Sequence, residues 1–246
     1  MSALHRHAHT LPAADALGQV LHPYQPTHTW AGEHLDRQWR ALAELPLNDE
    51  QLIQMKTRRW FGKVMRGWLR REDALKLYEL AWHARGDILE LGCYHGLSTS
   101  ILARAVHATD RTRRIHTCDL RADRVKHTLR NVARFGLGRY VHAEALDAIE
   151  LTRRFADAGR QVEFAFVDHS HAYEPVLQVC RLLDRVIAPG GFVYFHDFND
   201  ARNHRENPDY GVFQAVMDGL SPEAFEFWGT YGCAGLYRRR DDRLKT

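Results

Sequence analysis

The alternation of short apolar runs with helical stretches between residues 87 and 195 restricts the fold of this chain more than any other feature. The apolar runs are typical of buried strands and cover residues 87–91, 115–118, 140–143, 164–167 and 192–195. The stretches between them carry apolar residues at helical spacing and cover residues 98–106, 124–135, 145–156 and 174–187. This alternation predicts a parallel sheet with helices on both faces.

The C-terminal part of the chain departs from this alternation. Residues 225–228 and 235–238 have the composition of strands, and the glycine-rich segment Gly229-Thr-Tyr-Gly232 lies between them. A short glycine-rich connection is typical of antiparallel strands. The predicted fold class is therefore α/β, a Rossmann-like doubly wound sheet of five parallel strands with a C-terminal antiparallel pair at its edge.

The first 84 residues follow other patterns and divide the chain into three predicted parts. Residues 1–30 show no period and contain several prolines, which predicts a loose tail. Residues 31–84 have helical spacing, with one helix start expected near Leu52–Lys56 and another at Asp73, and are predicted to form a helical lid or cap. Residues 85–240 hold the alternating pattern and are predicted to form the main domain.

Composition excludes several classes of protein. The 246 residues carry a net charge of +3, and the arginines are scattered, which gives no reason to expect a nucleic-acid partner. No run of about 18 apolar residues is present, so no membrane span is expected. The four cysteines form no CxxC pair and fall mostly in or beside apolar runs, which indicates free thiols and a cytoplasmic protein.

Polar or glycine residues end all five predicted parallel strands. Ligands bind at the carboxyl ends of the strands in such a sheet, so these five termini are expected to converge on one site. In chain order the termini are Gly92-Cys-Tyr-His-Gly96, Asp119, Glu144-Ala145, Asp168-His-Ser-His171 and His196-Asp197.

The first of these termini has the features of a nucleotide-binding loop. Its glycines allow the backbone to approach a ligand at the start of the next helix. The spacing is G-x-x-x-G rather than G-x-G-x-x-G, which argues against a nicotinamide dinucleotide. Asp119 lies 27 residues after Gly92, where a carboxylate can bind the hydroxyls of a ribose, although an aspartate there can equally be a helix cap.

Taken together, three segments resemble the class I S-adenosylmethionine (SAM)-dependent methyltransferases. Residues 90–99, Glu-Leu-Gly-Cys-Tyr-His-Gly-Leu-Ser-Thr, resemble the first motif of that class. The Asp119 strand end resembles the second motif, and residues 183–192 are similar to the late proline–glycine–glycine turn. The resemblance implies a sheet of order 3-2-1-4-5-7-6 and spans roughly residues 68–238.

Two subgroups of this class look most similar. Phe195-His-Asp197 resembles the small-molecule methyltransferases of family 24, and the loop at Glu90 with Asp168-His169 resembles the catechol O-methyltransferase-like group. The resemblance implies that Gly92, Tyr94, Gly96 and Ser98 surround the methionine part of SAM and that Glu90 supports the loop. It further implies that Asp119 and Asp168 belong to the cofactor site, with Asp119 at the ribose, and that Ala145, Leu146 and His169 lie at the adenine.

The residues expected to perform the chemistry are Asp168, His171 and His196. A histidine titrates near neutral pH and suits a general base. In the catechol-like group a lysine follows the metal aspartate by three positions, and His171 occupies that position here. His171 is therefore our hypothesis for the base that deprotonates the acceptor.

A divalent ion such as Mg²⁺ is a second hypothesis for this site. Asp168, His196 and Asp197 could form a carboxylate–imidazole site. Without a metal, His196 and Asp197 could instead form a hydrogen-bonded pair that shapes the pocket, or His196 could act as a base. The catechol-like group has Asp-Asn after its fifth strand where this chain has His-Asp, and Asn199 or Asp200 could take over the missing role.

The sequence thus predicts a SAM-dependent methyltransferase that methylates a small molecule, more readily on oxygen than on nitrogen or carbon. Two alternatives stay open: an enzyme of the same fold that cyclises or cleaves SAM, and a SAM-binding module without turnover. The polar residues 198–211 predict a lid over the acceptor. The aromatic stretch Trp60–Trp68 could cover a ligand, fill the core or form a homodimer contact.

Overall fold

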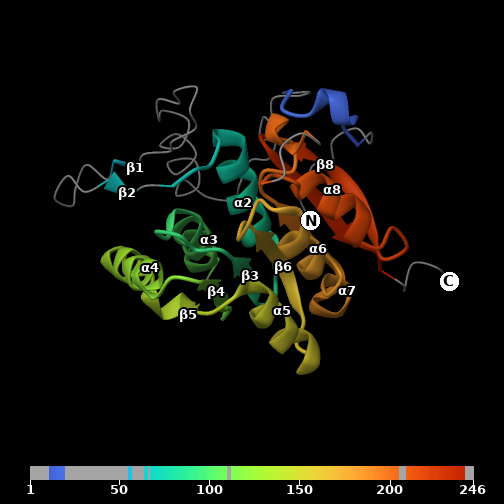
Figure 1. Cartoon of the computed structure of the whole chain (residues 1–246). Coiled ribbons are helices and arrows are strands. Elements are labelled where there is room, and N and C mark those ends of the chain that lie inside the picture. Colours follow the sequence, from blue (N-terminus) through green and yellow to red (C-terminus); the bar gives the residue numbers. More distant parts are fainter. Residues whose placement is uncertain are drawn as a thin grey trace.

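A computed structural model describes residues 11–19, 55–56, 64–65, 67–109, 112–204 and 209–241 of the chain. Its centre is a seven-stranded sheet of order β5-β4-β3-β6-β7-β9-β8 (Figure 1). The strands are β3 (Ile88–Leu91), β4 (Ile115–Asp119), β5 (Val141–Ala145), β6 (Val162–Val167), β7 (Ile187–Phe195), β8 (Phe225–Tyr231) and β9 (Ala234–Arg239). In order along the chain this is 3-2-1-4-5-7-6, which confirms the predicted topology.

Strand direction also agrees with the prediction. β5, β4, β3, β6 and β7 pair in parallel, whereas β9 pairs antiparallel with both β7 and β8. In-register partners such as Leu91 with Cys118 and Leu91 with Val167 align the carboxyl ends of the central strands. This alignment gathers the polar residues that follow the strands at one edge of the sheet.

Helices cover both faces of the sheet (Figure 1). Neighbouring strand residues alternate between two cores, because side chains along a strand point to opposite faces. The helices are α2 (Arg71–His83), α3 (Leu97–Ala108), α4 (Ala122–Arg134), α5 (Ala148–Asp157), α6 (Tyr173–Cys180), α7 (Leu183–Val186) and α8 (Val212–Gly219). Ile88 and Phe164 belong to the core under α2 and α3, and Leu89 and Ala165 belong to the core under α5 to α8.

The expected helix 174–187 is two helices, α6 and α7, and its last residue begins β7. The turn Pro189-Gly190-Gly191 lies within β7 as an irregularity: Val162 pairs with Ile187, but Phe164 pairs with Phe192. A Cβ on Gly191 would lie 2.8 Å from the carbonyl oxygen of Glu163. The glycine therefore allows the bulged strand to stay close to β6.

The N-terminal part differs from expectation at two points. Residues 11–19 contain the short helix η1 (Ala14–Ala16), and Leu17 is buried, so this part of the tail packs against the body. Met55–Lys56 (β1) pairs antiparallel with Val64–Met65 (β2), where a helix start was expected. A few apolar residues at helical spacing do not decide secondary structure over so short a stretch.

The other predictions for the N-terminal part fall only partly within the described residues. The predicted helix after Asp73 is present as α2, with Leu77, Leu80 and Ala81 buried. The helical pattern between residues 33 and 54 lies outside the described residues, as do Trp60 and Phe61. Within the described ranges, no helix is long and apolar enough to cross a membrane.

Candidate active site

The loop between β3 and α3 forms one wall of the site. Gly92 has a φ of 99° and Gly96 a φ of 86°, a backbone region that favours glycine. A Cβ on Gly92 would lie 2.2 Å from the carbonyl oxygen of Asp168. Glycine therefore allows the end of β3 to lie directly against the residues that follow β6.

Glu90 supports this loop from inside the sheet. Its side chain is fully buried and accepts a hydrogen bond of 2.6 Å from the Thr99 hydroxyl in the first turn of α3. Burial raises the pKa of Glu90 to about 7, although hydrogen bonds from neighbouring hydroxyls oppose the shift. The hydrogen bond from Thr99 links β3 to the first turn of α3.

Asp119 ends β4 beside the same loop. Its Oδ2 accepts a hydrogen bond of 3.2 Å from the backbone N–H of Tyr94, and its Oδ1 accepts one of 3.0 Å from the backbone N–H of Arg121. The guanidinium of Arg124 lies 3.5 Å from Oδ2 and also over the Tyr94 ring, 4.9 Å from its centroid. Arg124, which the sequence analysis did not single out, therefore lies at the proposed ribose position.

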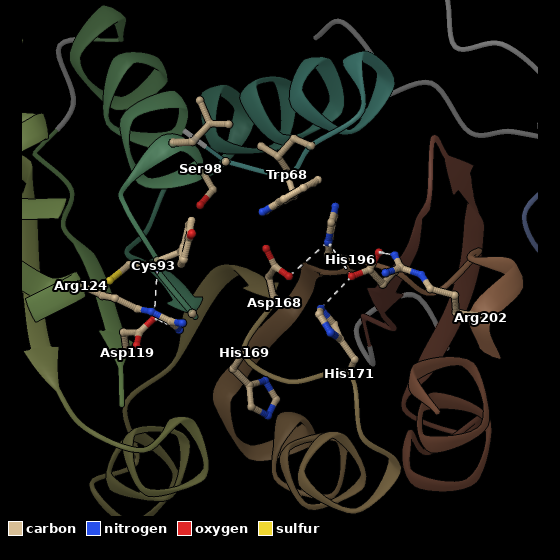
Figure 2. A pocket seen from close by; sticks show the side chains of 16 residues that line it. Trp68, Cys93, Ser98, Asp119, Arg124, Asp168, His169, His171, His196 and Arg202 are labelled. Atoms are coloured by element: carbon tan, nitrogen blue, oxygen red, sulfur yellow. Dashed lines mark hydrogen bonds and ion pairs between the residues drawn. The ribbon is translucent and has the colours of Figure 1, made fainter. Parts of the chain in front are cut away.

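A cavity of about 400 Å³ lies at the carboxyl ends of the parallel strands. Figure 2 shows Ser98, Asp119 and Arg124 at one side and His171, His196 and Arg202 at the other, with Asp168 between them. The predicted site residues that line this cavity are Gly92, Tyr94, Ser98, Asp119, Asp168, His169, His171, His196 and Asp197.

Four predicted cofactor residues lie behind or beside the lining. Glu90 and Gly96 contribute to the shape of the loop, as described above. Ala145 ends β5, and the backbone N–H of Leu146 donates a hydrogen bond of 3.1 Å to the carbonyl of Asp119. Ala145 and Leu146 therefore lie next to the Asp119 side of the cavity without lining it.

The acidic and histidine side chains expected after β6 and β7 lie within direct contact of one another. His196 Nδ1 lies 3.2 Å from an oxygen of Asp168 and 3.2 Å from an oxygen of Asp197. His171 Nε2 lies 3.0 Å from Asp197 Oδ2. Asp197 has a φ of 58°, an uncommon value that short polar residues tolerate and that recurs at functional sites.

His171 is held by the segment that precedes α8. Its ring stacks on Tyr210 with a centroid separation of 4.8 Å, and its carbonyl accepts a hydrogen bond of 2.7 Å from Gly211. Arg202 lies over the Tyr210 ring at 4.3 Å from the centroid and pairs with Asp200 at 2.8 Å. About half of the His171 side chain stays exposed, so its ring can meet a ligand in the cavity.

His196 has a second set of partners behind the cavity. Its Nε2 lies 3.3 Å from Cys233 Sγ and 3.6 Å from Asp73 Oδ2. Asp73 is fully buried on α2 and accepts hydrogen bonds from the backbone N–H groups of Arg70 and Cys233. Nothing in the sequence connects Asp73 or Cys233 with the site, because neither lies at the end of a parallel strand.

These contacts move the pKa values of the cluster. Burial disfavours a charged His196, but the carboxylates of Asp168 and Asp197 outweigh burial and raise the pKa of His196 well above its ordinary value. Burial also opposes ionisation of Asp197, yet His196 and His171 hold the pKa of Asp197 far below its usual range. Burial raises the pKa of Asp168, and the charge of His196 counteracts part of that shift.

The pKa values of His171 and His169, the other two histidines of the site, shift in opposite directions. The hydrogen bond to Asp197 is the main reason that the pKa of His171 is raised, although burial opposes it. Burial lowers the pKa of His169 to about 4, so that ring is neutral at neutral pH. His169 therefore suits contact with an uncharged ring, and His171 suits proton transfer.

The residues of the predicted metal site come together, but their chemistry does not fit a hard divalent ion. Such ions prefer oxygen ligands, and here His196 lies between the two carboxylates. Asp197 already pairs with His171, His196 and Arg202. Ligand atoms of Asp168, His171 and Asp197 lie within 4.8 Å of one another, so spacing alone would admit an ion. The cationic groups around Asp197 oppose one.

The two residues considered as substitute metal ligands have other partners. The buried Asn199 amide donates to the carbonyl of Gln19 at 3.1 Å and accepts from the N–H of Gly18 at 3.3 Å. Asp200 pairs with Arg202. Arg202 in turn has contacts with both Asp200 and Asp197.

Trp68 lies at the edge of the cavity, directly across from Asp168 (Figure 2). Its side chain is 58% exposed, so core filling does not account for it. It precedes α2 by three residues and belongs to the aromatic stretch for which a ligand-covering role was considered. Its position agrees with that role.

Comparison with known proteins supports the resemblance drawn from the motifs. Residues 89–198 match a family described as a methyltransferase domain, Methyltransf_24. This range contains the glycine loop, Asp119, Asp168, His171, His196 and Asp197. The resemblance to class I SAM-dependent methyltransferases and to family 24 is therefore confirmed. No curated protein matches the chain.

Solved structures share the fold at low sequence identity. The O-methyltransferase TomG from Streptomyces achromogenes, bound to SAM, is 20% identical with a TM-score of 0.57, over 85% of this chain and 90% of TomG. An O-methyltransferase from Bacillus cereus bound to S-adenosylhomocysteine is 17% identical with a TM-score of 0.56, over 91% and 94%. TrmN from Thermus thermophilus is 17% identical with a TM-score of 0.51; the match covers 68% of this chain but 48% of TrmN.

Proposed function

We propose that this chain, which carries a methyltransferase domain of the class I SAM-dependent type, transfers the methyl group of SAM to an oxygen of a small molecule. One observation carries the proposal. The glycine loop with Asp119 and the His171–Asp197 pair lie on opposite sides of a single cavity. A methyl donor held by the first would present its methyl group towards the second.

The cofactor placement follows the resemblance and the geometry of the loop. Gly92, Tyr94, Gly96 and Ser98 would surround the methionine part of SAM, and Asp119 would bind the ribose hydroxyls. Ala145, Leu146 and His169 would flank the adenine. The Arg124 guanidinium lies beside Asp119 Oδ2. It would have to move away before that oxygen could accept a hydrogen bond from a ribose hydroxyl.

His171 would act as the general base. Asp197 accepts a hydrogen bond from Nε2, which leaves Nδ1 as the basic atom, in the way a carboxylate orients a catalytic imidazole. Nδ1 would take the proton of the acceptor hydroxyl while the oxygen attacks the methyl carbon. The carbon–sulfur bond would break in line, and S-adenosylhomocysteine would leave. Positioning of the two reactants is expected to supply much of the rate enhancement.

The size of the cavity and the exposed Trp68 support a small planar acceptor. An aromatic ring offers a stacking surface for another ring. The acceptor hydroxyl should be acidic enough for a histidine to deprotonate, which favours phenols and enols over simple alcohols.

The experiment is a turnover assay with SAM and a panel of phenolic and aliphatic hydroxyl compounds, in which products are identified by mass spectrometry. We expect S-adenosylhomocysteine to form. His171→Gln should lower kcat by about 10²–10⁴-fold, the usual contribution of a general base, and leave the Kd for SAM unchanged. The exposed His142 provides a matched control, because His142→Gln removes a histidine outside the cavity.

Each alternative function gives another result in the same assay. Methylthioadenosine as the product would indicate a SAM-cleaving or cyclising enzyme. SAM binding without consumption of SAM by any acceptor would indicate a binding module. Full turnover by His171→Gln would exclude His171 as the base. Addition of EDTA should leave turnover unchanged, since the residues of the site do not fit a hard divalent ion.

A further inference from the structure

Asn203 is a fully buried side chain in the segment after β7, and it does not line the cavity. It is the last residue of the short helix η3 (Ala201–Asn203). Its amide nitrogen donates hydrogen bonds of 2.7 Å to the carbonyl of Asp197, 3.0 Å to that of Asp200 and 3.3 Å to that of Phe198. The two N–H groups of one amide are thus shared among three carbonyls of the turn after β7.

The backbone at Asp197 needs this kind of support. Its φ of 58° lies in a region that costs energy for a residue other than glycine and persists only where the surrounding structure holds it. The shortest bond from Asn203 goes to the carbonyl of this residue. The backbone conformation also sets the direction of the Asp197 side chain, whose Oδ2 lies 3.0 Å from His171 Nε2.

The other end of the Asn203 amide reaches the segment that holds His171. Its Oδ1 accepts a hydrogen bond of 2.9 Å from the backbone N–H of Phe213 in the first turn of α8. Just before α8, the N–H of Gly211 donates to the carbonyl of His171 at 2.7 Å, and the ring of Tyr210 stacks on His171. The start of α8 therefore supports His171 from the side opposite to Asp197.

We propose that Asn203 is a positioning residue for methyl transfer. Its amide nitrogen fixes Asp197, its amide oxygen fixes the start of α8, and the single side chain thereby sets the carboxylate of Asp197 against the ring of His171. The effect on turnover rests on the proposed function, because it acts through His171 as the base. The geometric role does not, since the pair is held in place whether or not a methyl group is transferred.

The contacts of Asn203 require an amide at this position. Buried backbone carbonyl and N–H groups lose free energy when they have no partner. An aspartate would offer no N–H to the carbonyls after β7 and would add a buried charge. A leucine would leave these carbonyls and the N–H of Phe213 without their partner. An asparagine supplies the donors and the acceptor together.

The first test compares crystal structures of the wild-type protein, Asn203→Ala and Asn199→Ala. In Asn203→Ala we expect Asp197 to leave its φ of 58° and the contact between His171 Nε2 and Asp197 Oδ2 to exceed about 3.5 Å, beyond hydrogen-bond distance. Asn199 is the matched control, because it is a buried asparagine of the same segment whose side chain bonds to Gly18 and Gln19. Asn199→Ala should keep the pair intact.

An Asn203→Ala structure with the backbone of Asp197 and its contact to His171 unchanged would overturn the proposal. If Asn203→Ala does not crystallise, Asn203→Ser gives the same comparison, because its side chain is too short to join Asp197 to α8. Neither structure needs an acceptor, so failure of the proposed methyl transfer would leave this test intact.

The second test is a double-mutant cycle on turnover. Asn203→Ala should lower kcat by up to about 10²-fold, as expected for a misplacement of about 1 Å, and leave the Kd for SAM unchanged. In the Asp197→Asn background the charged partner of His171 is already lost, so Asn203→Ala should lower kcat by a much smaller factor. Its effect on the free energy of unfolding should be similar in both backgrounds, because its hydrogen bonds go to backbone groups.

An equal fold-loss of kcat in both backgrounds would show that Asn203 does not act through Asp197 and would also overturn the proposal. Asn199→Ala is again the control, and any effect that it has on kcat should be the same in both backgrounds. Absence of turnover in the wild-type protein would contradict the proposed function, whereas the crystal structures would still decide the role of Asn203.

Discussion

At the scale of single residues, the histidines of the site differ in function because they differ in contacts. His196 has carboxylates against both ring nitrogens, so it is suited to hold a proton rather than to exchange one. His171 has one carboxylate against Nε2 and is half exposed. His169 is kept neutral by burial. The sequence places all three after strands and, through the family resemblance, assigns them different roles, but it does not show these contacts.

The pH dependence of turnover should follow the titration of His171. The hydrogen bond to Asp197 raises the pKa of His171, and a base works only when deprotonated. We therefore expect kcat to rise with pH along a limb centred above the ordinary histidine pKa of about 6.5. Asp197→Asn should move this limb to lower pH and reduce the plateau, because the ring loses its charged orienting partner.

The matched control for this profile is Asp218→Asn. Asp218 is an exposed carboxylate that accepts a hydrogen bond from Tyr173 at 2.9 Å, outside the cavity. Its removal should leave the limb in place. A profile that is flat between pH 6 and 9 in wild type, with measurable turnover, would contradict a histidine base.

Gly92 provides a second prediction at the same scale. Gly92→Ala places a Cβ 2.2 Å from the Asp168 carbonyl oxygen at a φ of 99°. Backbone strain of this kind costs about 1–3 kcal/mol, and the clash adds to it, so we expect a lower free energy of unfolding and weaker SAM binding. Gly136→Ala, at φ 71° with nothing within 4 Å, is the control for strain without a clash. Equal losses in both variants would show that the close approach to β6 is unimportant.

At the scale of elements, the segment after β7 is tied to the N-terminal part of the chain. Asn199 and Asn203 are both buried in this segment. Asn199 bonds to Gly18 and Gln19, and Asn203 donates to the carbonyls of Asp197 and Phe198. The loop that carries Asp197 is therefore tied to Gly18 and Gln19, which lie 181 and 180 positions from Asn199.

Asn199→Ala should remove the hydrogen bonds that link this loop to Gly18 and Gln19. Loss of the buried side-chain contacts is expected to cost about 1–3 kcal/mol of the free energy of unfolding, measured by denaturant titration. Cleavage by trypsin or chymotrypsin within the first 30 residues should become faster at the same time. Gln178→Ala, which removes a hydrogen bond to Glu174 on the exposed side of α6, is the control. Unchanged cleavage in Asn199→Ala would show that the segment is held by other contacts.

At the scale of the whole molecule, α2 covers the antiparallel edge of the sheet with a buried charged stripe. Asp73, Lys76 and Glu79 recur every three residues and are fully buried. Lys76 pairs with Glu79 at 2.9 Å and lies over the Tyr231 ring at 4.2 Å from the centroid. This helix lies outside the matched residues 89–198, yet through Asp73 it contributes to the site.

The buried pair yields a stability prediction. Lys76→Met should lower the free energy of unfolding by about 3–5 kcal/mol, because Glu79 loses its buried ion-pair partner. The double variant Lys76→Met/Glu79→Leu should recover most of that loss, since an apolar pair often replaces a buried ion pair at little cost. Denaturant titration measures both. A double variant no more stable than the single one would show that charge compensation is not the main contribution of the pair.

The sequence by itself determined the architecture and the edge at which the site lies. Strand–helix alternation predicted the doubly wound sheet because each strand must be buried on both faces. The glycine spacing predicted the loop at the end of β3, and polar strand ends predicted Asp119, Asp168, His171, His196 and Asp197 as neighbours. These features depend on short-range pattern and on the parallel order of the strands.

Only the tertiary structure decided which other charged and polar groups contact these residues. Asp73, Cys233 and Arg202 reach the cluster from α2, from the turn between β8 and β9, and from the loop after β7. None has a local motif, because a buried charge is compensated by whatever the fold brings near it. The same long-range contacts place His196 between Asp168 and Asp197 on the Nδ1 side and Asp73 and Cys233 on the Nε2 side.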